Sequence, residues 1–87
     1  MKYCLIGERL SHSYSAEIHR GRGLDYVLRE IPQGKLGEFV KEEYDGFNVT
    51  IPYKKDIIPY LDGTDEIAKS IGAVNTVVRK DGGYYGS

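Results

Sequence analysis

The sequence has 87 residues, of which 40% are hydrophobic and 29% charged, and its formal net charge is −1. This length and composition indicate one small globular domain, residues 1–87, with a modest core. Lys and Arg are scattered among Asp and Glu, so no nucleic-acid partner is expected. The single cysteine, Cys4, excludes an internal disulfide. No apolar run is long enough for a signal peptide or membrane span, so a cytoplasmic protein without a membrane partner is predicted.

Apolar periodicity and turn residues predict strands and helices that alternate along the chain. In chain order they are a strand at 1–6, a helix capped by Ser13 or Ser15 and running to 19, a strand at 24–31, a helix at 35–43, a strand at 47–51, a helix at 53–61 interrupted by Pro59, a helix at 64–71 capped by Thr64, and a strand at 73–80. A tight hairpin turn follows at Asp81-Gly82-Gly83. This order predicts an α/β layered domain with a mainly parallel sheet, an antiparallel edge strand and flanking helices.

The first segment with chemical potential is Ser11-His12-Ser13-Tyr14-Ser15, at the entry to the first helix. Free N–H groups at a helix N-terminus, together with serine hydroxyls, suit a carboxylate or phosphate. Ser13 and Ser15 are therefore candidate anion ligands. A second interpretation stays open, because serines at this place commonly act only as helix caps.

The second segment joins the strand at 47–51 to the helix that follows. Ligands of open α/β sheets bind beyond the carboxyl ends of strands, where Thr50 offers a hydroxyl. Lys54 follows one helical turn later, and a lysine near a second charge suits acid–base chemistry. The alternative is that Lys54 and Lys55 are two solvated lysines at the start of a helix, which is what a lysine pair usually indicates. Asn48 is predicted to be structural and to bond backbone groups.

The third segment surrounds Asn75, a polar side chain on the otherwise apolar strand at 73–80. It requires a hydrogen-bonding partner, which is either a ligand hydroxyl or a backbone group. Elsewhere the residues predict no further site. His12 and His19 have no acidic or histidine neighbours at ligand spacing, so no metal is expected. The Gly21-Arg22-Gly23 stretch precedes a strand, so it is not a phosphate-binding loop.

Together, in this order and at these separations, the segments resemble the shikimate dehydrogenase family along nearly the whole chain. The resemblance rests on His12-Ser13-Tyr14-Ser15 with Ile18-His19, on Asn48-Val49-Thr50-Ile51-Pro52-Tyr53-Lys54, and on Gly72-Ala73-Val74-Asn75-Thr76. It implies that the chain is the N-terminal, substrate-binding α/β domain of an enzyme that reduces 3-dehydroshikimate to shikimate with NADPH, in the route to aromatic amino acids.

The resemblance also implies a role for each candidate residue. Ser13 and Ser15 match the hydroxyls that bind the substrate carboxylate. Thr50, Lys54 and Asn75 match the residues around the ring hydroxyls. Lys54 resembles the catalytic lysine, which works with an aspartate of an Asn-Thr-Asp motif to move the proton that balances hydride transfer.

The chain stops at Ser87, where a hairpin strand is expected to continue, and this predicts a truncated protein. By the family spacing the Asn-Thr-Asp motif begins immediately after Ser87, and a Rossmann domain that holds NADP follows it. The resemblance therefore implies that this chain binds no cofactor and has no dehydrogenase activity alone. It also implies an uncovered apolar surface, through which two copies are able to dimerise.

Three positions depart from the family pattern: Arg9 and Ala16 stand where proline is usual, and Arg20 where asparagine is usual. Ala16 loses some rigidity at the start of a helix. Alternatives within the class are a quinate or aminoshikimate dehydrogenase, although serine at both 13 and 15 favours shikimate. Other classes are a non-catalytic module that binds a hydroxylated cyclic carboxylic acid, and a purely structural or interaction domain.

Overall fold

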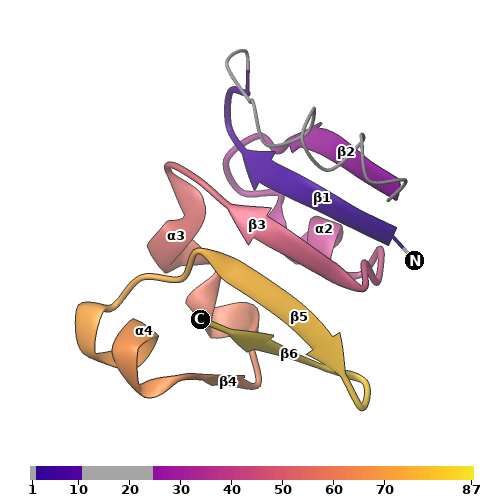
Figure 1. The fold of residues 1–87 in the computed structure, drawn as a ribbon. Helices are drawn as coiled ribbons and strands as arrows, with labels where there is room; N and C mark the ends of the chain where they lie inside the picture. Colours follow the sequence, from indigo (N-terminus) through magenta and orange to yellow (C-terminus); the bar gives the residue numbers. More distant parts are fainter. Residues whose placement is uncertain (1, 11–24) are drawn as a thin grey trace.

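The computed structural model describes residues 2–10 and 25–87. Their secondary structure alternates strands with short helices, as Figure 1 shows. The elements are β1 (Lys2–Gly7), β2 (Asp25–Glu30), α2 (Leu36–Val40), β3 (Gly46–Val49), α3 (Tyr53–Asp56), the 3₁₀ helix η1 (Ile58–Tyr60), β4 (Gly63–Thr64), α4 (Glu66–Ile71), β5 (Thr76–Lys80) and β6 (Gly83–Gly86).

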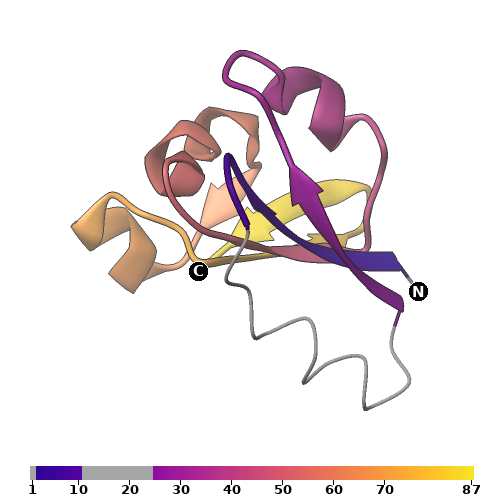
Figure 2. The ribbon, with the colours of Figure 1, turned by 90° about the horizontal axis from the view of Figure 1, so that it is seen from above.

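The strands form one mixed sheet in the order β2-β1-β3-β5-β6-β4. Strand β1 pairs parallel with both β2 and β3, β4 pairs parallel with β6, and β5 runs antiparallel to both β3 and β6. Helices α2 and α3 cover the same face of this sheet (Figure 2). The predicted α/β class is confirmed. The carboxyl ends of β1 and β3 lie at the same end of the sheet as the start of β5 (Figure 1).

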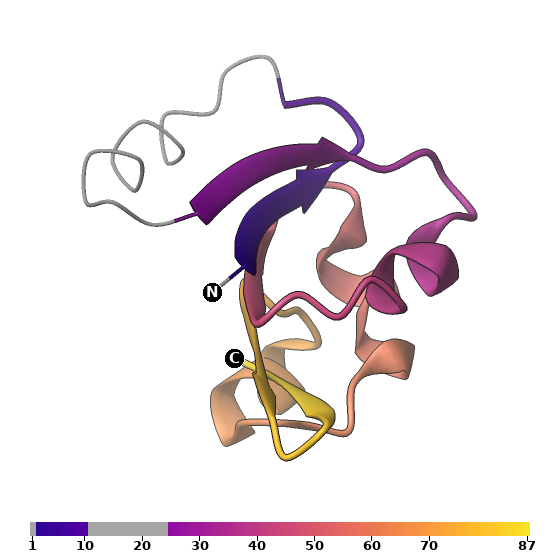
Figure 3. The same ribbon diagram turned by 90° about the vertical axis from the view of Figure 1, so that its right-hand side faces the viewer.

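The alternation of side chains along the strands explains the two faces. In β1, Cys4 and Ile6 belong to the larger core cluster, whereas Leu5 belongs to a second cluster with Tyr26 of β2. This is the period of two that a strand imposes, because successive side chains point to opposite faces. The sheet is twisted, with α2 and α3 on one side of β1 and β3 (Figure 3).

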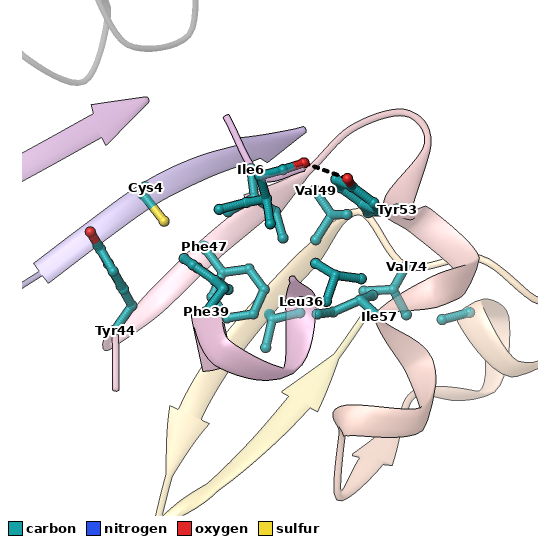
Figure 4. Close-up of a cluster of buried hydrophobic side chains, with 13 residues drawn as sticks. Cys4, Ile6, Leu36, Phe39, Tyr44, Phe47, Val49, Tyr53, Ile57 and Val74 are labelled. Carbon is teal, nitrogen blue, oxygen red and sulfur yellow. Dashed lines mark hydrogen bonds between the residues drawn. The ribbon is translucent and has the colours of Figure 1, made fainter. Parts of the chain in front are cut away.

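The main core is an aromatic and aliphatic layer between the sheet and its helices (Figure 4). The Phe39 ring of α2 stacks on Tyr44 at 5.4 Å and meets Phe47 edge-on at 5.1 Å, measured between ring centroids. The phenol of Tyr53 donates a hydrogen bond to the carbonyl of Ile31, so this buried hydroxyl is paired. The core thereby ties α2 and α3 to β3.

Several element boundaries differ from the prediction. Helix α4 begins at Glu66 and is capped by Asp65, whose carboxylate accepts a 2.7 Å hydrogen bond from the Ala68 N–H. The prediction that Thr64 is the cap is wrong, because Thr64 pairs with β6 in the two-residue strand β4, which was not predicted. The hairpin turn is confirmed: Asp81 and Gly82 have φ values of 53° and 81°, as a type I′ turn requires.

Cys4 has no exposed surface, as its apolar neighbours in the sequence predict. Desolvation raises the pKa of its thiol from 9.0 to about 12. Between these values the unfolded chain has released a proton that the folded chain retains. The unfolded state therefore binds fewer protons, and stability decreases as the pH rises.

We expect the free energy of unfolding to decrease above pH 9, with Cys4 contributing about 1.4 kcal/mol per pH unit. Urea unfolding at several pH values between 8 and 11 measures this slope. Cys4→Ala is the control, because it retains every other titrating group and should show the shallower slope. Equal slopes in the two proteins would contradict the assignment to Cys4.

Candidate functional site

Thr50 lies directly after β3, at the carboxyl ends of β1 and β3. Its N–H donates to the Ile6 carbonyl at 2.9 Å, which extends the pairing of β3 with β1. The side chain of Thr50 packs against Gly7, where an added Cβ would lie only 2.6 Å from Thr50 Cγ2. Glycine at position 7 therefore allows the chain leaving β1 to pass close to this half-buried threonine.

Lys54 is presented by α3, which starts immediately beyond Thr50. The Ile51–Pro52 peptide bond is cis, and the Tyr53 N–H donates to the Thr50 carbonyl at 3.0 Å. Lys54 is half-buried, and among the described residues no carboxylate lies within ion-pair distance of its ammonium. The short helix thus keeps the backbone of Lys54 close to the end of β3.

Asn75 lies in the bend between α4 and β5, so its predicted place within a strand is wrong. The strand begins one residue later, because the N–H groups of Asn75 and Thr76 both donate to the Ser87 carbonyl. When two successive N–H groups donate to the same carbonyl, the regular hydrogen-bond ladder between two strands is interrupted. The side chain of Asn75 is exposed and available to a ligand.

Backbone hydrogen bonds bring Thr50, Lys54 and Asn75 together. The Val49 N–H, one residue before Thr50, donates to the Asn75 carbonyl at 2.8 Å. The Val74 N–H donates to the Lys54 carbonyl, also at 2.8 Å. The first bond links Asn75 to the residue before Thr50. The second links Lys54 to the residue before Asn75. The fold therefore places a threonine, a lysine and an asparagine at one end of the sheet.

A chain of side-chain hydrogen bonds next to these residues was not predicted. The phenol of Tyr26 donates to Asn48 Oδ1 at 2.8 Å, and Asn48 Nδ2 donates to Thr76 Oγ1 at 3.1 Å. The expectation that Asn48 bonds backbone groups is therefore wrong for these contacts. Asn48 precedes Thr50 by two residues, which is the spacing of side chains on the same face of a strand. In the sequence, this spacing could have indicated that the side chain of Asn48 lies beside that of Thr50.

A hollow of about 210 Å³ lies on the face of the sheet that carries the side chain of Asn48. Its lining includes Tyr3, Tyr26, Asn48, Thr76 and Val78. The polar ends of Asn48 and Thr76 enter a surface that is otherwise mostly apolar, which is typical of a small-molecule site.

A protein-family model described as the shikimate dehydrogenase substrate binding domain matches residues 5–77. The chain belongs to this family. The NADP(+) shikimate dehydrogenase of Staphylococcus aureus (strain MRSA252) is 48% identical over 96 aligned positions, which cover 99% of this chain and 36% of that protein. This chain therefore spans about a third of that relative's length.

Solved structures of shikimate dehydrogenases have the same fold. Shikimate dehydrogenase 1 of Peptoclostridium difficile matches with a TM-score of 0.89 and 36% identity, covering 99% of this chain and 36% of that one. The shikimate 5-dehydrogenase of Thermus thermophilus, solved in complex with shikimate, matches with a TM-score of 0.89 and 30% identity, covering 99% of this chain and 37% of that one.

Two predicted ligands of this shikimate dehydrogenase domain, Ser13 and Ser15, lie outside the described residues. Within residues 2–10 and 25–87, no three His, Cys, Asp or Glu side chains gather as metal ligands would. In the same ranges, no helix has the length and apolar character needed to cross a membrane.

The described residues do not fit NADP, the cofactor named for the S. aureus relative. Helices α2, α3 and α4 have only four to six residues each. None of the three follows a strand through a Gly-x-Gly-x-x-Gly turn, the device that brings a backbone close to a pyrophosphate.

Proposed function

We propose that this chain binds shikimate and 3-dehydroshikimate, as the substrate-binding domain of an NADP-dependent shikimate dehydrogenase. The observation that carries the proposal is the backbone hydrogen bonding that groups Thr50, Lys54 and Asn75 beyond the end of β3. A hydroxyl, an ammonium and an amide suit a ligand with several hydroxyl or carbonyl oxygens. The shikimate complex of the Thermus thermophilus relative supports this ligand class.

Each residue takes the part that its chemistry allows. The hydroxyl of Thr50 and the amide of Asn75 hydrogen-bond ring oxygens, and the hydroxyls of Ser13 and Ser15 hold the carboxylate. The substrate carbonyl oxygen gains one proton as it becomes a hydroxyl, and Lys54 Nζ gives that proton. In the reverse direction the same amine receives it.

NADPH supplies the hydride when it is bound, and another domain must hold it. The poor fit of the described residues to a dinucleotide supports this part of the proposal. The chain alone is therefore expected to bind no cofactor and to be inactive. The 36% coverage of the S. aureus relative is consistent with this division of labour.

Titration of shikimate into the ¹⁵N-labelled chain tests the substrate. We expect saturable NMR shifts of the backbone amides of Ser13, Ser15, Thr50, Lys54 and Asn75, because ligand oxygens enter their surroundings. Quinate is the matched control ligand, and tighter binding of quinate would favour the related dehydrogenase class. A well-dispersed spectrum that ignores both acids would contradict the proposal for this chain.

Cytoplasmic location belongs to the same proposal. The free thiol of Cys4 and the absence of a spanning helix from the described residues support it. Fractionation of cells that produce the tagged protein tests it, and recovery outside the cytoplasm would contradict it. Dimerisation through exposed apolar surface, and the lack of nucleic-acid or membrane partners, stay predictions.

A further inference from the structure

Three side chains from three strands form a continuous row of hydrogen bonds across the sheet. Tyr26 lies in β2, Asn48 in β3 and Thr76 in β5, and the row runs from the phenol through the amide to the threonine hydroxyl. All three residues line the hollow, and Tyr26 is 6% exposed whereas Asn48 and Thr76 are half-buried. The Tyr26 end of the row is therefore the more buried one.

The row has a direction. The phenol of Tyr26 is a much stronger acid than the aliphatic hydroxyl of Thr76, so it is the better donor and the poorer acceptor. Burial, followed by the nearby Cys4, raises the pKa of Tyr26 to about 12. The phenol therefore keeps its proton at neutral pH and donates it to Asn48 Oδ1, as the geometry shows.

This direction determines what the site offers a ligand. Asn48 Oδ1 accepts from Tyr26, so the amide turns its Nδ2 group away from β2, and one Nδ2 proton bonds Thr76. Thr76 Oγ1 accepts that proton and keeps its own hydroxyl proton to donate. Among residues 2–10 and 25–87, no acceptor is found for the second Nδ2 proton or for the Thr76 hydroxyl proton.

We propose that Tyr26 is a positioning residue, which fixes the Asn48 amide so that its Nδ2 group, and not its oxygen, faces the ligand and selects a ligand oxygen over an ammonium group. The inference rests on the proposed function, because it takes the ligand to lie beside these residues. An ammonium has three donors and no acceptor, so it would leave the second Nδ2 proton of Asn48 unpaired. A hydroxyl or carbonyl oxygen accepts that proton.

The first test needs no ligand. A carbonyl carbon is deshielded when its oxygen accepts a hydrogen bond, so Tyr26→Phe should move the ¹³Cγ resonance of Asn48 upfield. Thr76→Val removes only the acceptor of Nδ2 and should leave that resonance nearly in place. The reverse pattern would show that the row runs in the opposite direction and would overturn the proposal. This measurement stands whether or not shikimate is the substrate.

The second test compares the affinities of shikimate and aminoshikimate, in which an ammonium replaces one ring hydroxyl. The wild-type chain should favour shikimate by about tenfold or more, as one unpaired donor predicts. Tyr26→Phe should weaken shikimate binding by about 3- to 10-fold and narrow the preference, because the amide can then turn over. An unchanged preference in the variant would overturn the proposal.

Matched variants separate positioning from folding. Tyr84→Phe removes another tyrosine hydroxyl, one that bonds the Val40 carbonyl at 2.9 Å, and should leave both affinities unchanged. If Tyr26→Phe does not fold, Asn48 decides: Asn48→Asp replaces the Nδ2 donor with an oxygen and should lose the preference, whereas Thr76→Ser keeps the acceptor of Nδ2 and should retain it. An unchanged preference in Asn48→Asp would overturn the proposal. Failure of every protein to bind shikimate would instead count against the proposed function, and the ¹³Cγ shift would still report on Tyr26.

Discussion

Replacing Phe39 with alanine is expected to remove a large part of the stability of this domain. The ring is 2% exposed and contacts Tyr44 and Phe47 at centroid distances of 5.4 and 5.1 Å. Truncating a buried phenylalanine costs about 3–5 kcal/mol, since it removes apolar burial and leaves a cavity. A domain of this length has about 4–13 kcal/mol of stability, at roughly 0.05–0.15 kcal/mol per residue. Urea unfolding followed by circular dichroism measures the loss.

Two controls show whether the cavity is the cause. Phe39→Leu keeps a large apolar side chain in the core and should lose markedly less stability than Phe39→Ala. Ile67→Ala removes an apolar side chain that is 71% exposed on α4, and should change stability by less than about 0.5 kcal/mol. A loss below about 1 kcal/mol for Phe39→Ala would mean that α2 does not anchor the core in solution.

Short-range physics makes most of the fold predictable from the sequence. The Asp81-Gly82 turn follows from two residues that tolerate positive φ. The helix predicted at 53–61 is interrupted, but the break between α3 and η1 is at Ile57, and Pro59 lies inside η1. The cap of α4 was misassigned because Thr64 and Asp65 are neighbours that both suit a cap, and only the pairing of β4 with β6 decides between them. A two-residue strand such as β4 has no periodicity of its own to detect.

The candidate site also has a part that the sequence predicts and a part that only the fold reveals. Thr50, Lys54 and Asn75 stand in contiguous motifs, so a resemblance was enough to propose them. The row from Tyr26 to Asn48 depends on the sheet order instead, because 22 residues separate the two and β1 lies between their strands. No local pattern contains that order, so the partner of Asn48 became visible only in three dimensions.

The two lysines of α3 differ in their surroundings. Lys54 is half-buried and its carbonyl accepts from Val74, which fixes α3 against the bend before Asn75. Lys55 follows on the same short helix but is exposed to solvent. If Lys54 transfers the proton that balances hydride transfer, its amine matters for the chemical step, whereas the amine of Lys55 does not.

Lys54→Met should therefore reduce kcat by about 10²- to 10⁴-fold, the contribution expected of a positioned acid–base group, with a much smaller effect on KM for the substrate. The change can be measured in a chimera that joins residues 1–87 to the remainder of the S. aureus relative, which is 48% identical. NADPH oxidation with 3-dehydroshikimate gives both constants. Lys55→Met is the matched control, with the same loss of charge one residue away, and should stay within about twofold of the parent because an exposed lysine makes no positioned proton transfer. A Lys54→Met chimera that keeps more than a tenth of the parent kcat, or an equal loss in both variants, would remove Lys54 from the proton-transfer step and leave it a role in binding alone.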